Sequence, residues 1–222
     1  VGRDTLEFLH DRVQQAARGL LSAQDQEDTH LALARHLLAE LGTEARAERL
    51  FDIVGHLAGV LHRLTDPDER MALARLHLEA AERARDSAAY APAFGYLQAA
   101  LELAGEGIWT TDRAFALHLH RVAAEVAFSA TDFESMEQLC AAVVANTDQA
   151  LDRASIYEVR INATVGRNDL VGAIETALEI LADLGVRMPA DPGQVHVVAG
   201  LLRTKWALWG RSMDDLAAMP RC

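Results

Sequence analysis

The sequence predicts an all-α fold in which antiparallel helix hairpins stack into a right-handed α-solenoid of about ten helices. Ala- and Leu-rich segments with apolar residues three and four positions apart follow one another from Thr5 to Met219, a spacing typical of amphipathic helices. No proline occurs between Pro92 and Pro189, so no proline breaks a helix there. Each hairpin would bury its apolar stripe against its neighbours, which favours a stacked array.

The helices of the first half are placed by their apolar stripes. The stripe of the second helix includes Leu31, Ala34 and Leu37, and Gly42 is a natural stop. Asp66 is the expected N-cap of the fourth helix, with Pro67 at its first position. The expected ranges are about 11–21, 25–41, 45–64, 67–85 and 88–103.

The helices of the second half are placed by cap residues. The sixth follows Asp112 and reaches about Phe128, while Asp132 and Asp148 open the seventh and eighth. The ninth opens at Asn168-Asp169 and stops at Gly185. Two prolines and a glycine predict a linker at 188–194, followed by a terminal helix pair at 195–222 whose second piece covers 212–219.

Composition and charge limit the classes of partner. The formal net charge is -12, which argues against nucleic acid, because phosphate binding needs clustered Lys and Arg. Charged residues interrupt every apolar run before the ~20 residues of a membrane span, so no membrane partner is expected. The two cysteines, Cys140 and Cys222, form no spacing motif and fit a reducing cytoplasm.

Metal and catalytic motifs are weak in this chain. Glu7/His10 and Glu27/His30 have the Glu-x-x-His spacing of di-iron bundles, but in an antiparallel hairpin the two motifs would be offset by roughly 9 Å. No phosphate loop, His-Glu-x-x-His or nucleophile elbow occurs. We therefore expect no catalytic, cofactor-binding or metal-binding residue in this segment. A helical-bundle metal-binding protein or enzyme is the alternative of another class.

A degenerate repeat marks the start of three expected helices. It reads Tyr90-x-x-Ala93, Phe133-x-x-Met136 and Leu170-x-x-Ala173, with spacings of 43 and 37 residues. The run Asp169-Leu170-x-x-Ala173-Ile174-x-x-Ala177-Leu178 resembles the second helix of a tetratricopeptide repeat. This resemblance implies a tetratricopeptide-like array over 11–187.

A second resemblance covers the chain to about Pro192. Phe8-Leu9-His10-Asp11-Arg12-Val13-Gln14-Gln15-Ala16-Ala17 resembles a signature of very large signalling proteins. Those proteins combine a serine/threonine kinase-like domain, a STAND-class AAA-type ATPase, a helical repeat region, a GAF domain and a sensor histidine kinase. Softer similarities include Arg49-Leu50-Phe51-Asp52-Ile53-Val54 and Tyr96-Leu97-x-Ala99-Ala100-Leu101, while Arg18-Gly19 departs from the family's Tyr-Ser.

This second resemblance implies a role and a context. Residues 1–10, in which Leu6 to Phe8 alternate as in a short strand, would be the tail of an upstream winged-helix or ATPase module. The chain begins at Val1 without a methionine, and we expect it to be a piece of such a bacterial protein. The repeats would sense an inducer or bind a protein, and ATP would bind only elsewhere in the parent. A sensor region of a STAND-type transcription regulator is the alternative.

Candidate surface residues fall in two groups. Arg121, Tyr157 and Arg160 are polar positions on helices expected to line the concave face. Trp206 and Trp209 lie in the most basic stretch of the chain, with Arg203 and Lys205 nearby. The tryptophans have two interpretations: they close the end of the core, or they form a ridge that binds a partner. That partner would be a domain of the same parent chain, another protein or a small inducer.

Overall fold

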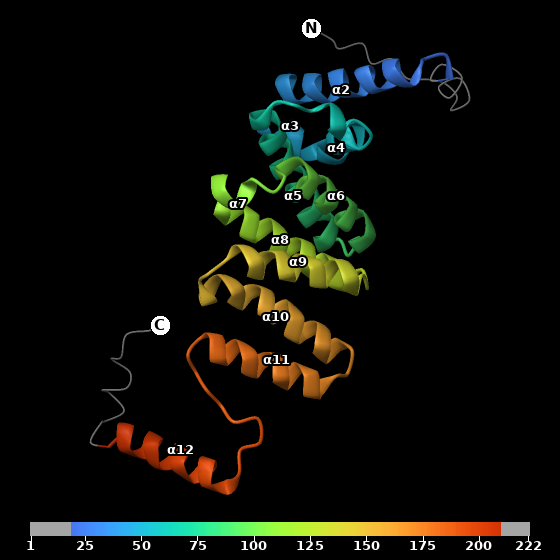
Figure 1. The fold of residues 1–222 in the computed structure, drawn as a ribbon. Helices are drawn as coiled ribbons and strands as arrows, with labels where there is room; N and C mark the ends of the chain where they lie inside the picture. The colour runs from blue at the N-terminus through green and yellow to red at the C-terminus, as the bar shows by residue number, and fades with distance from the viewer. Residues whose placement is uncertain (1–18, 210–222) are drawn as a thin grey trace. The chain divides into compact units, whose positions relative to one another are not determined.

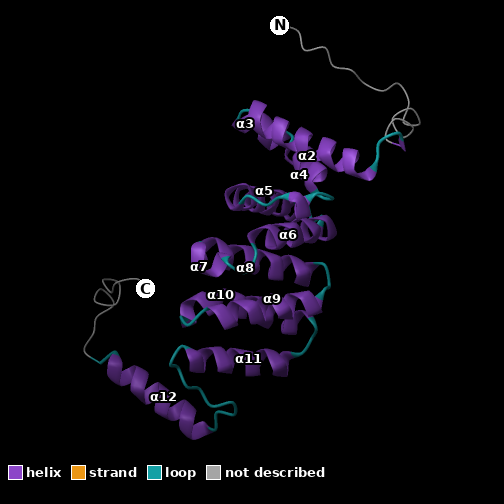
Figure 2. Cartoon of the chain, turned by 45° about the horizontal axis from the view of Figure 1, so that its top comes forward, coloured by secondary structure: helices purple, strands orange, loops and turns teal. Residues whose placement is uncertain are grey.

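The structure is a computed structural model that describes residues 19–209 of the chain. Over that range all regular structure is helical, with eleven α-helices, one 3-10 helix and no strand (Figures 1 and 2). The all-α prediction is therefore confirmed for these residues. The elements are α2 (Ala23–Glu40), α3 (Thr43–Glu48), α4 (Leu50–Leu57), η1 (Leu61–Arg63), α5 (Pro67–Asp86), α6 (Tyr90–Ala104), α7 (Ile108–Thr111), α8 (Arg113–Ser129), α9 (Phe133–Asn146), α10 (Ala150–Gly166), α11 (Leu170–Asp183) and α12 (Gln194–Ala207).

Three predicted segments lie outside the described residues. They are the strand at 6–8, most of the helix at 11–21 and the last helical piece at 212–219. Contacts group the chain into two units, Val1–Val159 and Arg160–Cys222, with the division inside α10. The repeat region expected over 11–187 thus spans this division. In the part of the chain that the structure describes, no helix is both long and apolar enough to cross a bilayer.

The first helix that the structure describes in the first unit is α2, which packs against α4. Ser22 caps α2 by accepting a hydrogen bond from the Asp25 N–H at 3.1 Å. The single helix predicted over 45–64 is wrong, because the chain forms α3, α4 and η1 there. The polar α3 buries no residue and the helix breaks at Arg49. Gly59 weakens the helix beyond α4.

The helices α5 and α6 form the densest packing of the first unit. Asp66 caps α5 as predicted, with its carboxylate 2.8 Å from the Glu69 N–H. Arg70, in the first turns of α5, donates to the carbonyls of Glu102 at 2.6 Å and Leu103 at 3.2 Å, near the end of α6. This side chain ties the start of α5 to the end of α6.

The helices α8 and α9 continue the first unit. α8 packs against both α6 and α9, and it also touches α5. Asp112 and Asp132 cap the two helices as predicted, accepting from the N–H groups of Phe115 and Ser135. The short α7 was not predicted; it contributes the buried Ile108 and packs on α8. The buried positions of α8 are mostly Ala, Val and Leu, in line with the low aromatic content.

The same turn recurs at the ends of three helices. The N–H groups of Ala89, Asp132 and Asp169 each donate to a carbonyl five residues earlier, at 2.9, 2.9 and 3.0 Å. The residue before each donor has a positive φ, namely Ala88 (57°), Thr131 (62°) and Asn168 (60°). These are Schellman turns, which satisfy carbonyls at helix ends.

The repeat found in the sequence coincides with these turns. Tyr90, Phe133 and Leu170 are the first residues of α6, α9 and α11. The residues three positions later, Ala93, Met136 and Ala173, are all buried. The repeat therefore corresponds to equivalent places in three helices.

The second unit contains α11 and α12. Asp169 caps α11 by accepting from the Gly172 N–H at 2.9 Å. Gly185, with φ of 81°, ends it in another Schellman turn, closed by the Val186 N–H and the Leu181 carbonyl. Both ends were predicted. A non-helical connection follows, and α12 starts after Gly193.

Candidate interaction surface

The helix α12, on which every residue with a described burial is exposed, is the candidate functional site. Trp206 and Trp209, one turn apart, expose 77% and 79% of their surface. The interpretation in which they close the core does not fit this exposure. Aliphatic side chains on the same helix are also exposed, namely Val195, Val197, Val198, Leu201, Leu202 and Leu208. Exposed apolar side chains gathered on one helix make α12 a candidate interaction surface.

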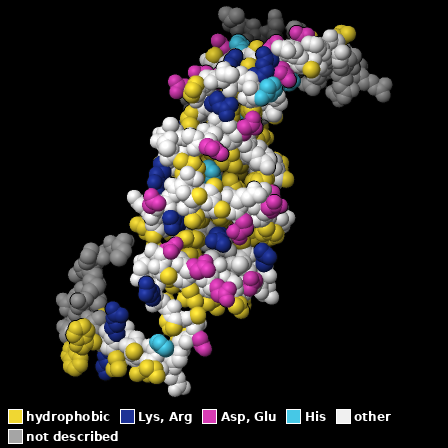
Figure 3. Space-filling model, viewed as in Figure 1, with side chains coloured by type: hydrophobic (Ala, Val, Ile, Leu, Met, Phe, Trp, Pro, Cys, Tyr) yellow, Lys and Arg dark blue, Asp and Glu magenta, His cyan; other side chains and the backbone are white. Residues whose placement is uncertain are grey.

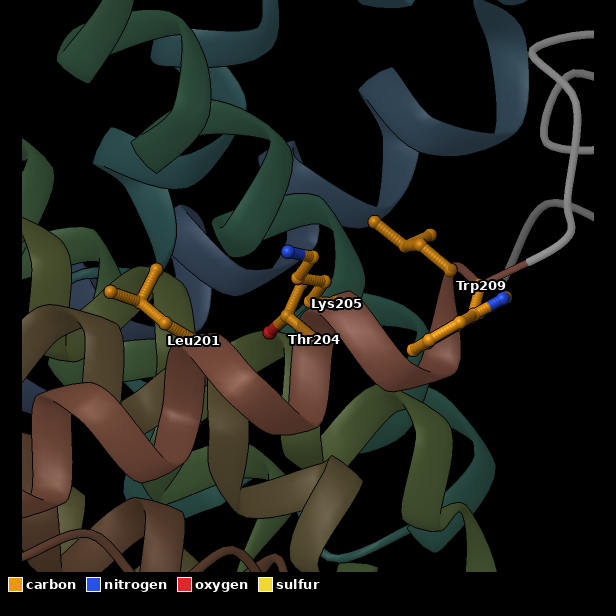
Figure 4. Close-up of a pocket in the computed structure, with 5 residues that line it drawn as sticks. Leu201, Thr204, Lys205 and Trp209 are labelled. Carbon is orange, nitrogen blue, oxygen red and sulfur yellow. The ribbon is translucent and has the colours of Figure 1, made fainter.

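A hollow lies along this helix. Leu201, Thr204, Lys205, Leu208 and Trp209 line a cavity of about 730 Å³ (Figure 4). The lining is largely apolar, with one hydroxyl and one ammonium group. A pocket of this size with few polar groups suits an inserted apolar side chain or a small organic molecule.

The charge of α12 differs from that of the chain. Residues 194–209 contain Arg203 and Lys205 and no acidic residue, whereas the whole chain carries a net charge of -12. Figure 3 shows basic and hydrophobic side chains side by side on this helix. The neighbouring α11 has the opposite sign, with Glu175, Glu179 and Asp183 and no basic residue. Basic groups on an apolar helix are complementary in charge to acidic groups on another surface.

Arg121, Tyr157 and Arg160 lie in different settings. Arg121, on α8, forms an ion pair with Glu125 at 2.5 Å. Tyr157, on α10, is only 9% exposed, so its ring belongs to the core more than to an open groove. Arg160, also on α10, is partly buried and has a partner. Among the predicted surface residues, Trp206 and Trp209 are the pair that one element presents together.

A second cavity, of about 610 Å³, lies at the end of α6 and was not predicted. Trp109 and His120 line it, with ring centroids 4.6 Å apart. His120 is buried and its Nδ1 lies 2.8 Å from the Ala116 carbonyl oxygen, so Nδ1 donates. Burial lowers the pKa of His120. His118 lies two positions before His120 and therefore points in another direction, as expected. Its Nε2 lies 3.1 Å from Glu82 Oε1.

Of the two Glu-x-x-His motifs, the structure describes only Glu27/His30. Glu7 and His10 lie outside the described residues. Glu27 lies 3.5 Å from His62 Nε2 and 3.6 Å from Arg63 Nη1. His30 contacts His56 of α4, with 3.0 Å between their Nδ1 atoms. Between residues 19 and 209, no group of three or more His, Cys, Asp or Glu side chains is arranged to hold a metal ion.

Comparisons with protein-family models, with curated proteins and with solved structures found no match.

Proposed function

We propose that this chain is a tetratricopeptide-like α-solenoid, a non-catalytic module that binds a protein or an inducer. Three local features support the architecture. Packing proceeds from α5 to α6, from α6 to α8 and from α8 to α9, as in a stack of hairpins. The link from Arg70 to the end of α6 suits an antiparallel pair. The Schellman turns recur at matching positions.

A repeated histidine also supports the hairpin array. His77 on α5 and His120 on α8 are 43 residues apart, the same spacing as Tyr90 and Phe133. The Nδ1 atom of each contacts the carbonyl four residues earlier, and both rings are buried. We infer that α5–α6 and α8–α9 are two copies of one structural unit.

The observation that carries the function is the exposure of α12, on which every residue with a described burial is exposed. Its two tryptophans, aliphatic residues and basic residues form a surface with the composition of an interaction hot spot, where Trp and Arg contribute most of the binding energy. The partner that fits is an apolar groove bordered by carboxylates. In the proposed cytoplasmic parent protein, this partner is a domain of the same chain or another protein, and a small inducer would compete for the hollow beside Trp209.

The proposed mechanism is a shift between two states of the parent protein. The ATPase or kinase of a large signalling chain would be restrained while α12 is docked and released when an inducer binds the undocked form better. The effect on the equilibrium equals the difference in affinity for the two forms. Couplings of this type are typically 5–150-fold.

The test is ATP hydrolysis by the parent chain carrying Trp206→Ala and Trp209→Ala together. We expect its basal rate to rise by at least about fivefold, because the docked state loses both anchors. Leu151→Ala is the matched control, since Leu151 is equally exposed but lies on α10. A double variant with the wild-type rate would contradict the proposal.

A further inference from the structure

Two histidines from different helices meet in the first unit. His30 of α2 and His56 of α4 are both partly buried, with ring centroids 5.2 Å apart and ring planes tilted by 43°. Their Nδ1 atoms are 3.0 Å apart. Two nitrogens bound to one ion at about 2.0–2.1 Å lie about 2.9–3.4 Å apart for angles of about 90–109° at the ion. The pair therefore already has the separation of two ligands of one metal ion.

The space beside this pair is open. His30 and His56 line a cavity of about 310 Å³, together with Glu27, Gln26 and two glycines. Gly55 and Gly59 flank His56 along α4 and the following turn, and neither has a neighbouring atom within 4 Å of the place a Cβ would occupy. The cavity has room for an ion and the water molecules that complete its coordination.

The charge beside the pair favours a cation. Glu27 lies one turn before His30 on the same helix and lines the same cavity. Its carboxylate is only loosely held, because Arg63 Nη1 and His62 Nε2 are 3.6 and 3.5 Å away, beyond good hydrogen-bond distance. The guanidinium of Arg63 is closer to Asp28, at 2.7 Å. Glu27 can therefore accept a hydrogen bond from water bound to the ion.

We propose that His30 and His56 bind a late first-row divalent ion of the zinc type and thereby link α2 to α4. Imidazole nitrogens suit such ions. Two protein ligands leave the remaining positions to water. This site is independent of α12 and of the proposed signalling role. The competing arrangement is a neutral pair in which one Nδ1–H donates to the other Nδ1.

The test is calorimetric titration of the 222-residue chain, free of any histidine tag, with Zn²⁺ at pH 7.5. We expect one zinc ion per chain and a rise in the melting temperature with zinc. His30→Gln and His56→Gln should each weaken binding by at least about tenfold. His36→Gln is the matched control, because His36 is exposed on the same helix α2 and should leave the affinity unchanged.

Three outcomes would overturn the proposal. They are no zinc binding by the wild type, binding that survives in both histidine variants, and an equal loss in His36→Gln. Circular dichroism checks that each variant keeps its helicity. If a variant loses helicity, imidazole ¹⁵N–¹H correlation spectra of the wild type test the proposal instead. Zinc must then shift the ring signals of His30 and His56 and leave those of His36 unchanged.

Discussion

At the scale of single residues, the buried histidines show how a polar ring is accommodated in this core. The Nδ1 atoms of His77 and His120 lie 2.9 and 2.8 Å from the carbonyls of Leu73 and Ala116. A carbonyl oxygen only accepts, so each ring carries its proton on Nδ1. Burial lowers the pKa of both rings, and the hydrogen bond to the carbonyl opposes that shift. The folded state therefore favours the neutral form of both rings.

These pKa shifts predict that the protein loses stability in mild acid. A histidine in the unfolded chain titrates near ~6.5, and the pKa values of folded His77 and His120 are lower. Below pH ~6.5 the unfolded chain binds more protons, so the free energy of unfolding falls with pH down to the folded pKa. Above pH ~6.5 the ring is neutral in both the folded and the unfolded chain, so the free energy of unfolding no longer depends on these two histidines. Urea unfolding at several pH values measures the slope.

The variants His77→Gln and His120→Gln should each flatten this slope. His36→Gln, which changes an exposed histidine, should keep the wild-type slope. If all three variants follow the wild-type curve, the buried rings are not the source of the acid sensitivity.

At the scale of the elements, the recurring Schellman turn is the main local signature. It places Ala88, Thr131 and Asn168 in the left-handed region, which glycine and asparagine adopt at low cost and a β-branched residue does not. Thr131 offsets part of this cost through the hydrogen bond from its hydroxyl to the Ala130 carbonyl. The turn between α8 and α9 is therefore the most strained of the three.

This strain predicts that Thr131→Gly stabilises the protein by about 0.5–1 kcal/mol, the left-handed penalty less the backbone entropy of glycine. Chemical denaturation measures the change. Asn168→Gly is the comparison and should change stability less, because asparagine tolerates this conformation. Lower stability of Thr131→Gly would show that the threonine hydroxyl outweighs the strain.

The boundaries of elements were predictable where local chemistry fixes them. Asp66, Asp112, Asp132 and Asp169 each cap the helix that the sequence assigned to them, because capping depends only on residues within one turn. The break at Arg49 was missed because Ala, Arg and Glu, which fill residues 44–49, all favour helix, so nothing local signals an end there. α7 was missed because four residues give no periodicity.

The candidate sites were less predictable from the sequence than the helix caps. Trp206 and Trp209 were identified from composition, but their exposure depends on what packs against α12 and is not encoded locally. The contact of His30 with His56 joins residues 26 positions apart, and no spacing rule within one helix reveals it. Tyr157 was proposed for an open face and is buried, since polar type alone does not set the direction of a side chain.

At the scale of the whole molecule, the chain is strongly acidic, and among the α-helices that the structure describes α12 differs because it carries basic residues and no acidic one. The net charge of -12 favours solubility. Against this background, α12 concentrates exposed indoles and cations on one short element. In the proposed function, this chain binds a partner, and neighbouring domains of a larger protein carry out the catalysis.

The central claim is that α12 presents its tryptophans to a partner, and tryptophan fluorescence tests it most directly. The chain has three tryptophans, so a Trp109→Phe variant reports only Trp206 and Trp209. We predict red-shifted, readily quenched emission from the isolated variant, and a blue shift when the ATPase region of the proposed parent protein is added. Blue-shifted, quencher-protected emission from the isolated variant would contradict the account, because it would mean that α12 is already buried within its own chain.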